Sequence, residues 1–597
     1  MRRAHYLPGN KSCELPANCI WFDTETQSVE LTNDEEIPYL WFGYAAFRRR
    51  RDKQHWCEPE WLRFTTRAQF WDWVTEHCRD RCRLHIFCHN GQFDLPVLDA
   101  FNELPDRGFK LTSAIVECPP MMLVWKRGRQ TIRFIDTLNL WRLPLSSIGD
   151  HVGLPKLPMP KEGASLSSWD VYGKRDVEII MAACLKWFGF LRDHDLGGFA
   201  PTLASQALTT FRHRFMEARI VIDDNEEALA LARQAYKGGR TECFKLGRYE
   251  GTFYHVDVNS MYPAVMRSES YPVALVGVYS RNSLKELGEC LAHYRVIADV
   301  DIETRTPCYP KVVDGRLCFP VGRFRAQLSS PELEYGLARG HIRRVYPMSL
   351  YTAGRPFGGF VEFFYRQRRI AAEAGDDAAK WFLKILPNSL YGKFGQRGRR
   401  YETESVEVDS GIKVWAEINA QTREITRHRQ FGGIRQHFVE EGESRHSHPA
   451  IAAHIAAYAR MKLWDIIQAA GRTNCWYTDT DSVVVNQEGY ARLSGQLDDV
   501  ALGALKLEAT YRRIELFAPK DYLFDGERKT KGVSAHATWR SDNEITQSQF
   551  VGFKGLLNRG HLHAPIIRKQ EKVLARVYTK GRPQADGRVL PLRLSDW

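Results

Sequence analysis

The sequence lacks any run of about 18 apolar residues, the length that a membrane-spanning helix needs. Its first residues, MRRAHYLPGNKSC, also lack the apolar centre of a signal peptide. Fixed-period repeats and low-complexity tracts are absent, which excludes solenoid and fibrous proteins. We therefore expect a protein that does not associate with membranes and that resides in the cytoplasm.

A disulfide framework is absent as well. The 13 cysteines are odd in number and scattered, as is typical of reduced thiols in a large intracellular protein. The segment EHCRDRCRLHIFCHN gathers cysteine and histidine, but its spacing is not that of a zinc finger and its second half has the pattern of an apolar strand. We expect no structural zinc in this segment.

The composition is that of a folded multidomain protein. A chain of 597 residues is too long for one hydrophobic core, and 44% hydrophobic with 26% charged residues excludes the disordered class. The net charge is +12. This excess of lysine and arginine favours a polyanionic partner such as nucleic acid.

Two aspartates interrupt the apolar segment WYTDTDSVVV, residues 476–485. In a single strand Asp479 and Asp481 would share one face, with Thr480 on the other. Two unpaired carboxylates repel each other there, and a divalent cation is a common shared partner. An exposed turn is the alternative, since Asp, Thr and Ser favour turns.

Four acidic residues punctuate the first 195 positions, where strands and helices alternate in an α/β pattern. Asp23 and Glu25 share one face at the end of a strand, Asp94 follows a second strand, and Asp176 lies on a helix. Such carboxylates could converge on two metal ions and support hydrolysis of a phosphodiester. Tyr172, four residues before Asp176, lies on the same helical face and could orient the attacking water. Taken singly, each segment is also compatible with a solvated surface.

In this order the residues match DxE, NxxxD-type and YxxxD motifs. The region resembles the proofreading 3′ to 5′ exonuclease domain of family B DNA polymerases. The resemblance implies a ribonuclease H-like fold in which the four acids bind the metals. It also implies that the single-stranded primer end is held by His89, Asn90, Phe93, Thr137 and Leu138.

Two further segments of the chain combine charge with an apolar pattern. Asp257 interrupts the strand of YHVDVNSMYPAVM. The segment KWFLKILPNSLYGKFG places Lys380, Lys384, Asn388 and Tyr391 along one helix face, which could grip a triphosphate and stack on a base. Taken alone, this segment is equally compatible with an ordinary amphipathic helix whose lysines lie in water. Its proline, at position 387, is expected to kink or loosen the turn between Lys384 and Asn388.

The segments DVNSMYP, KILPNSLYG and YTDTDS follow each other in the order of the three polymerase motifs of family B and match them closely. The resemblance implies two Mg²⁺ ions per active site, with Mn²⁺ as a substitute, held here mainly by Asp257 and Asp481. Asp479 is expected to act more through its charge, and Lys384 to neutralise the triphosphate. The residues implied in nucleotide binding are Ser260, Tyr262, Lys380, Lys384, Asn388, Tyr391 and Gly392.

Two shorter motifs resemble those of the protein-primed branch of this family. AYKGGR, with Tyr236, Gly238 and Gly239, resembles the YxGG motif that handles the template. KDY, with Lys520 and Tyr522, resembles the KxY motif that steadies the primer end. We expect these residues and Thr480 to contact DNA.

The resemblance implies an α/β and α+β multidomain fold, a ribonuclease H-like exonuclease domain followed by a right-hand polymerase with two insertions. The expected segments are 1–195 exonuclease, 196–269 first part of the palm, 270–355 first insertion, 356–395 fingers, 396–447 second insertion, 448–519 second part of the palm and 520–597 thumb.

The function implied is a DNA-directed DNA polymerase with proofreading, acting as a monomer on template, primer and dNTPs in the cytoplasm of a host cell of bacterial type. A terminal protein would serve as primer for a viral, plasmid or mobile-element genome. Primer-independent synthesis is an alternative, because such relatives share the core motifs. An inactive DNA-binding structural subunit is the alternative from another class.

Overall fold

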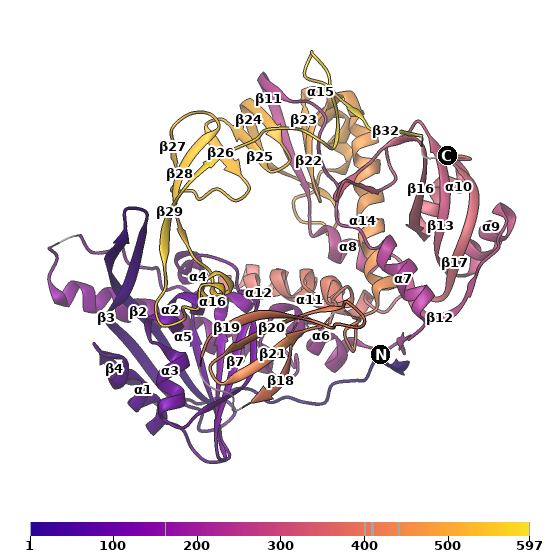
Figure 1. Ribbon diagram of the computed structural model, residues 1–597. Coiled ribbons are helices and arrows are strands. Elements are labelled where there is room, and N and C mark those ends of the chain that lie inside the picture. Colours follow the sequence, from indigo (N-terminus) through magenta and orange to yellow (C-terminus); the bar gives the residue numbers. More distant parts are fainter. Residues whose placement is uncertain (1, 162, 399–400, 407–410, 440–441, 596–597) are drawn as a thin grey trace.

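The structure is a computed structural model, and it describes residues 2–161, 163–398, 401–406, 411–439 and 442–595. Its elements are arranged around a ring (Figure 1). The N-terminal sheet, in indigo and purple, occupies the lower left, and two further sheets lie at the top and the right. Within the described ranges no helix is long and apolar enough to span a bilayer.

The N-terminal sheet contains three parallel strands, β2 (Asn18–Thr32), β5 (Arg83–Cys88) and β8 (Gln130–Asp136). Residues 19–22 of β2 and residues 84–88 of β5 form buried runs because both faces of the sheet are covered there. Trp21 packs into the core beneath α5 (Leu166–Asp193), while the neighbouring Ile20 and Phe22 enter the core on the side of α1 (Arg67–Glu76). Asp23 and Glu25 lie within the long β2 and not at its end, because β2 continues as a ribbon with β3 (Glu35–Arg49).

A seven-stranded sheet forms the centre of the second half of the chain. Its strands, in spatial order, are β10 (Thr241–Cys243), β22 (Cys475–Asp479), β23 (Ser482–Asn486), β11 (Gly247–Val258), β24 (Leu505–Ala518), β25 (Asp521–Phe524) and β26 (Glu527–Thr530). The prediction of one strand over 476–485 is wrong: the segment is a hairpin. Thr480 adopts a left-handed conformation with φ 63°, so the chain reverses between the two aspartates.

Three helices connect this sheet to the N-terminal sheet: α11 (Gly358–Glu373), α12 (Asp377–Asn388) and α13 (Leu390–Phe394). Pro387 is accommodated inside α12, which ends one residue later, so Tyr391 belongs to α13 and not to the helix of the two lysines. Trp381 packs on Trp141 with ring centroids 5.6 Å apart, which fixes α12 to the N-terminal domain.

The segment from residue 201 to the glycine pair at 238–239 is not one continuous helix. The chain instead forms α6 (Leu203–Thr210), a π-helical turn η2 (Phe211–Phe215), the short strand β9 (Val221–Ile222) and α7 (Glu226–Ala235). β9 pairs with β1 (His5–Tyr6), so the start of the chain lies against this connection before it runs to β2.

Two smaller sheets occupy the intervals expected to be insertions. The first contains β12 (Tyr271–Tyr279), β17 (Ile342–Gly354), β13 (Arg295–Thr304), β16 (Val321–Ser329) and, from the end of the chain, β32 (Arg593–Ser595). The second contains β18 (Tyr401–Val406), β21 (Ile434–Phe438), β20 (Ile425–Phe431) and β19 (Lys413–Ile418). Residues 399–400, 407–410 and 440–441 of the expected second insertion lie outside the described residues.

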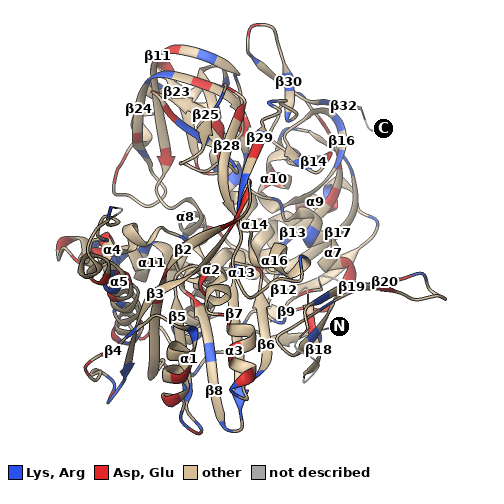
Figure 2. Ribbon diagram, turned by 60° about the vertical axis from the view of Figure 1, so that its left-hand side comes forward, with Lys and Arg blue, Asp and Glu red and all other residues tan. Residues whose placement is uncertain are grey.

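The C-terminal arm, β27 (Thr538–Trp539), β28 (Glu544–Phe550) and β29 (Ile567–Val573), forms the left side of the ring and joins the N-terminal sheet (Figure 1). Ile567 pairs with Glu36 of β3, and the Lys569 amide donates to the Asp34 carbonyl over 2.7 Å. Lys and Arg residues are spread over all parts of the fold, β8, β19 and β29 among them (Figure 2). The positive charge therefore does not belong to one domain.

Candidate active sites

The first carboxylate cluster lies on β2 and α5. Asp23, Glu25 and Asp176 each offer an oxygen, and these oxygens lie within 4.8 Å of one another. The alternation of β2 places Asp23 and Glu25 on the face covered by α5, which carries Asp176. Sequence positions more than 150 residues apart thus meet because the helix packs back on the sheet.

Asp94 borders this cluster from α2 (Gly91–Val97). Its carboxylate accepts a 2.7 Å hydrogen bond from the Thr24 hydroxyl, between the two acids of β2. Burial, together with the other acids, raises the pKa of Glu25 to about 7, and burial is also the main cause that raises the pKa of Asp94 to about 7. A buried oxygen of Asp176, Oδ1, has no hydrogen-bond partner among the described residues. Repelling carboxylates with an unpartnered oxygen fit the binding of divalent cations.

Lys156 is a residue of this site that sequence reasoning missed. Its ammonium group donates to Asp176 Oδ2 and lies 4.3 Å from the centre of the Tyr172 ring. Burial raises the pKa of the Asp176 carboxyl, and the hydrogen bond and charge of Lys156 lower it. The loop LPKLPMPKEG around this lysine carries no pattern that distinguishes it from a solvated connection.

The residues expected to hold a single strand form a hydrogen-bonded loop beside the cluster. His89 contacts the Thr137 hydroxyl at 2.9 Å through Nδ1 and the Leu143 carbonyl at 3.0 Å through Nε2. Thr137 is 1% exposed, so its side chain is positioned to orient His89 and not to reach solvent. Asp136, also missed, accepts hydrogen bonds from three backbone N–H groups, those of Asn90, Gly91 and Leu138.

Phe93 extends from this loop toward the C-terminal arm. Its ring lies 5.7 Å from that of Phe550 on β28. The loop therefore lies where the N-terminal domain and the arm meet.

The second carboxylate cluster lies in the central sheet. Asp257 ends β11 beside the hairpin tip, where the Val258 amide donates to the Asp481 carbonyl over 2.9 Å. Burial and the neighbouring Asp481 raise the pKa of Asp257 to about 7. Burial and Asp479 raise the pKa of Asp481 to about 6. Two half-buried carboxylates whose burial and neighbouring acids raise their pKa fit a divalent metal site.

Asp479 has different surroundings from Asp481. Its carboxylate accepts hydrogen bonds from the hydroxyls of Thr241 at 3.1 Å, Thr480 at 3.1 Å and Tyr477 at 3.3 Å. Lys520 lies 3.4 Å away as a counter-ion. These partners anchor Asp479 to the sheet, so the hairpin holds two aspartates of unequal freedom.

Glu508 is a second carboxylate that sequence reasoning missed. It lies on β24 beside Asp257, whose pKa it raises further, and it accepts a 3.0 Å hydrogen bond from Lys506. The alternating segment KLEAT gives no sign that this glutamate differs from a solvated strand residue.

The helix residues expected to bind a nucleotide lie along a cleft of about 1570 Å³ between α12 and the N-terminal domain. Lys380, Lys384, Asn388 and Gly392 line it, together with residues such as Arg142 and Arg429. The charge of Lys384 also lowers the pKa of Asp257, which places this lysine between the cleft and the carboxylates. The Asn388 amide donates to the Lys384 carbonyl over 2.7 Å and closes the end of the helix.

Tyr262 and Tyr391 stack on each other beside this lysine helix. Their ring centroids are 4.1 Å apart with an interplanar angle of 11°. Ser260 precedes Tyr262 in a left-handed conformation with φ 51°, which turns the chain from β11 into α8 (Met261–Ser268). The structure thus brings residues of two separate motifs together.

The short motifs also converge on the hairpin. A Cβ at Gly239 would lie 2.8 Å from Thr480 Cγ2. A Cβ at Gly238 would have no heavy atom of the described residues within 4 Å. Arg460, ion-paired with Glu332, donates to the Gly238 carbonyl over 3.1 Å. On the opposite side the Lys520 amide donates to the Tyr477 hydroxyl over 3.1 Å, and the Tyr522 ring stacks on Phe524.

Comparisons with known proteins agree with this arrangement. Residues 199–468 match the family described as DNA polymerase type B, organellar and viral. The DNA-directed DNA polymerase of Enterobacteria phage PRD1 is 28% identical over 313 residues, which cover 51% of this chain and 52% of the phage protein. The chain thus spans about half the length of this curated relative, and alignments with others cover less of theirs.

Solved structures resemble the whole chain. Phi29 DNA polymerase in a ternary complex with primer-template DNA and incoming nucleotide substrates has a TM-score of 0.68 at 18% identity, covering 94% of this chain and 100% of that one. Its binary complex with primer-template DNA gives a TM-score of 0.67. At this identity the likeness is one of fold, and it confirms the expected fold class.

Proposed function

Because residues 199–468 match the family of type B DNA polymerases of organellar and viral type, we propose that this chain is a DNA-directed DNA polymerase that extends a primer with dNTPs. One observation carries the proposal. Asp257 and Asp481, from different parts of the sequence, adjoin at the tip of the central hairpin, within the influence of Lys384 and close to the Tyr262–Tyr391 stack.

The side chains suit phosphoryl transfer by positioning and charge stabilisation. Asp257 and Asp481 would hold the divalent ions, which we propose to be Mg²⁺, with Mn²⁺ as a substitute. When bound, such ions neutralise phosphate charge and favour ionisation of the attacking hydroxyl. Lys384 and Lys380 would bind the triphosphate, and Asp479 would act through its charge and through the position of the hairpin.

Aromatic residues would select the nucleotide. Tyr262 would lie under the sugar and exclude ribonucleotides, since a tyrosine ring leaves little room for an added hydroxyl. Tyr391, with Gly392 and Asn388, would pack against the nascent base pair. The stacking of Tyr262 on Tyr391, with ring centroids 4.1 Å apart, holds the proposed sugar and base contacts next to each other.

The N-terminal cluster supports a 3′ to 5′ exonuclease. Asp23, Glu25, Asp94 and Asp176 would hold the divalent ions, and Tyr172 with Lys156 would orient the attacking water. His89, Asn90, Phe93 and Leu138 would hold the frayed primer end, with Thr137 acting through His89. The template and primer would be handled by Tyr236, Gly238, Gly239, Thr480, Lys520 and Tyr522 around the hairpin.

The initiating primer is proposed to be a terminal protein in the replication of a viral, plasmid or mobile-element genome. The YxGG-like and KxY-like segments on both sides of the hairpin support this branch, as does the separate five-stranded sheet at 271–354. The chain would act as a monomer in the cytoplasm of a bacterial host cell. Synthesis by the purified chain alone on unprimed circular single-stranded DNA would favour primer-independent initiation instead.

The two activities can be tested separately. Asp257→Asn and Asp481→Asn are each expected to abolish extension of a primed template and to leave trimming of single-stranded DNA intact. The double variant Asp23→Ala, Glu25→Ala is expected to abolish trimming of single-stranded DNA and to leave extension of a primed template intact. Extension that persists in Asp257→Asn would refute the polymerase proposal, and DNA binding without incorporation by the unmodified chain would favour an inactive structural subunit.

A further inference from the structure

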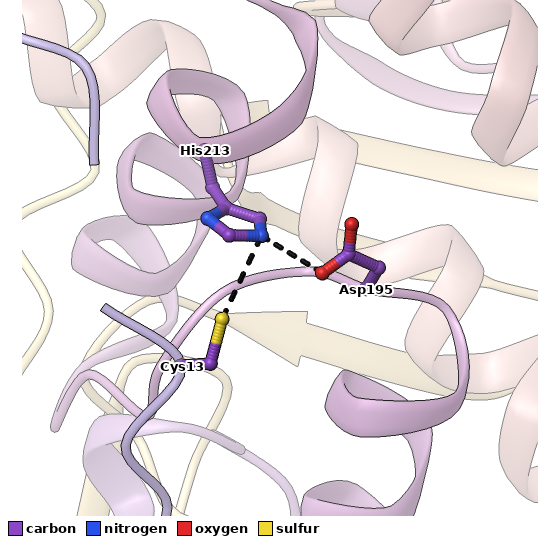
Figure 3. Close-up of side chains that lie close together, drawn as sticks. All are labelled: Cys13, Asp195 and His213. Atoms are coloured by element: carbon purple, nitrogen blue, oxygen red, sulfur yellow. Dashed lines mark hydrogen bonds and ion pairs between the residues drawn. The ribbon is translucent and has the colours of Figure 1, made fainter. Parts of the chain in front are cut away.

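A third group of metal-ligating side chains shares no residue with either carboxylate cluster. Cys13, Asp195 and His213 each offer one ligand atom, and these atoms lie within 4.8 Å of one another (Figure 3). They come from three segments: the run from β1 to β2, the turn after α5, and η2. None of them takes part in the proposed polymerase or exonuclease chemistry.

The imidazole ring presents one nitrogen to this group. His213 Nδ1 lies 2.9 Å from the Asn10 carbonyl, an acceptor only, so Nδ1 carries a proton and donates. Nε2 is therefore the nitrogen whose lone pair is available, and it faces both other residues: Asp195 Oδ1 at 2.9 Å and Cys13 Sγ at 4.0 Å. A metal-ligating histidine characteristically donates its other N–H to a backbone carbonyl in this way.

The same geometry argues against a nucleophilic cysteine triad. In such a triad the acid and the nucleophile contact opposite nitrogens of the imidazole. Here both converge on Nε2, as dashed lines show in Figure 3. Convergence on a single lone pair fits a shared cation instead.

We propose that Cys13, His213 and Asp195 form a binding site for one Zn²⁺ ion, with water at a fourth position. A thiolate, an imidazole and a carboxylate together match the ligand preference of Zn²⁺ and not of Mg²⁺, which selects oxygen ligands. Tetrahedral Zn²⁺ would separate sulfur and nitrogen ligands by about 3.5 Å. The 4.0 Å between Cys13 Sγ and His213 Nε2 needs only a small movement of the exposed Cys13 side chain.

The surroundings leave room for the cation. Arg212 and Arg214 flank His213, but their guanidinium groups donate to the carbonyls of Pro8 and His194. The His213 side chain is 12% exposed, whereas that of Asp195 is 70% exposed, so the ion would reach the site from the solvent side. Binding would release the thiol proton of Cys13 and any proton on Nε2 to water.

Zn²⁺ at this site would tie the N-terminal segment to the junction between the N-terminal domain and the polymerase region. The segment is otherwise held there by backbone hydrogen bonds, such as Gly198 N to Ser12 O at 2.7 Å and Asn10 N to Arg212 O at 3.0 Å. Because η2 is a π-helical turn, a form frequently found at functional sites, His213 lies on a local distortion of the chain. We therefore assign the site a structural function.

The test measures metal binding by the full chain after removal of metals with a chelator. Zn²⁺ alone is titrated against a chromogenic competitor in excess Mg²⁺, and Co²⁺ is added separately as a spectroscopic probe. One equivalent is expected to bind, with the charge-transfer absorption of a Co²⁺–thiolate bond. Since loss of an outer-shell partner costs roughly 10–100-fold in affinity, Cys13→Ser and His213→Ala are each expected to lower affinity at least about a hundredfold.

Cys82→Ser is the matched control, because Cys82 is also an exposed free thiol. It is expected to bind Zn²⁺ as the unmodified chain does. Zn²⁺ should also slow tryptic cleavage after Lys11 in the unmodified chain and in Cys82→Ser, but not in Cys13→Ser. Equal Zn²⁺ affinity of Cys13→Ser and Cys82→Ser, or a Co²⁺ complex without thiolate absorption, would overturn the proposal. Circular dichroism of each variant separates lost binding from lost folding.

Discussion

At the scale of single residues, the surroundings of each aspartate decide what it can do. Asp479 is satisfied by three hydroxyls and a lysine, whereas burial and a neighbouring carboxylate raise the pKa of Asp257 and of Asp481. An acid that stays protonated until pH 6 or 7 costs free energy when it is ionised in the folded chain. The same repulsion is what a divalent cation would relieve.

This cost predicts a pH-dependent stability. The pKa of Asp257 is raised from 3.8 to about 7, so between about pH 4 and 7 the folded chain holds a proton that the unfolded chain has lost. The contribution of Asp257 to the free energy of unfolding therefore falls as the pH rises from about 4 to 7. Without divalent ions, Asp257→Asn is expected to be more stable than the unmodified chain at pH 8, by on the order of 1–2 kcal/mol, and not at pH 4.5.

Thermal unfolding at the two pH values measures this difference. Mg²⁺ should raise the unfolding temperature of the unmodified chain more than that of Asp257→Asn at pH 8, and this excess should shrink at pH 6. Asp542→Asn removes a carboxylate that is 93% exposed and serves as control. The assigned electrostatics predict that Asp257→Asn gains more stability over the unmodified chain at pH 8 than at pH 4.5. A smaller gain at pH 8 would contradict them.

Lys156 gives the second residue-scale prediction. Lys156→Ala removes the charge that lowers the pKa of Asp176, so this buried acid is expected to hold its proton to higher pH and to bind metal less well. Trimming of single-stranded DNA should fall about 10–100-fold, with primer extension unchanged. Lys174→Ala is the control. Lys174 is on the same helix as Asp176, α5, but its ammonium group lies over the Trp61 ring. Equal trimming by both variants would remove Lys156 from the site.

Sequence reasoning found the acids of both clusters because a carboxylate inside an apolar strand is conspicuous. It missed Lys156, Asp136 and Glu508 for a physical reason. Their partners are supplied by distant segments, such as the backbone of residues 90–91 for Asp136, and their own neighbours are ordinary loop or strand residues. Thr137 was expected to reach DNA, but burial makes it a support for His89.

At the scale of elements, the hairpin of β22 and β23 organises the central site. The sequence pattern favoured one strand because Asp479 and Asp481 alternate with Thr480 as strand residues do. The structure instead holds Thr480, a β-branched residue that disfavours this conformation, in a left-handed turn, which a pattern of period two does not reveal. The turn is held from outside, since the Thr480 amide donates to the Arg240 carbonyl over 2.7 Å.

This contact predicts opposite outcomes for two adjacent glycines. In Gly239→Ala the new Cβ would lie 2.8 Å from the Thr480 side chain and 3.2 Å from its Cα, so the hairpin tip must shift. We expect a loss of about 1–3 kcal/mol in stability and a large loss of extension. In Gly238→Ala the new Cβ has no heavy atom of the described residues within 4 Å, so this variant should unfold at the same temperature as the unmodified chain. Thermal unfolding and primer extension are measured for both variants. Equal stability of Gly239→Ala and Gly238→Ala would show that the turn adapts to the added Cβ.

At the scale of the whole molecule, the contacts form a closed circuit. The N-terminal domain meets α12 through Trp141 and Trp381, α13 meets α8 through Tyr391 and Tyr262, and β11 joins the central sheet. The C-terminal arm then returns to β3 over more than 500 residues of sequence. Local patterns identified each region, but a pairing at that separation leaves no trace in a single sequence. The circuit places the expected domains around one ring (Figure 1).

If DNA passes through this ring, as the proposed function suggests, then sealing the ring should trap it. Glu36 and Ile567 are cross-strand partners, and their Cα separation in an antiparallel ladder, about 4.5–5.5 Å, suits a disulfide. The double variant Glu36→Cys, Ile567→Cys, oxidised after loading on a primed circular template, is expected to stay bound at a salt concentration that strips the unmodified chain. It should slide off a linear template and leave the circle when the disulfide is reduced.

Glu36→Cys alone is the control, because the native cysteines are present in both proteins and only the double variant can close the ring. Retention is measured as the fraction of protein that remains with the DNA after the salt wash, and extension of the trapped complex on adding dNTPs shows that the enclosed chain is active. Equal release from circular and linear DNA by the oxidised double variant would mean that DNA lies outside the circuit of contacts. In that case the arm would act as a brace between domains, because its pairing with β3 joins the N-terminal sheet to the central sheet whether or not DNA passes between them.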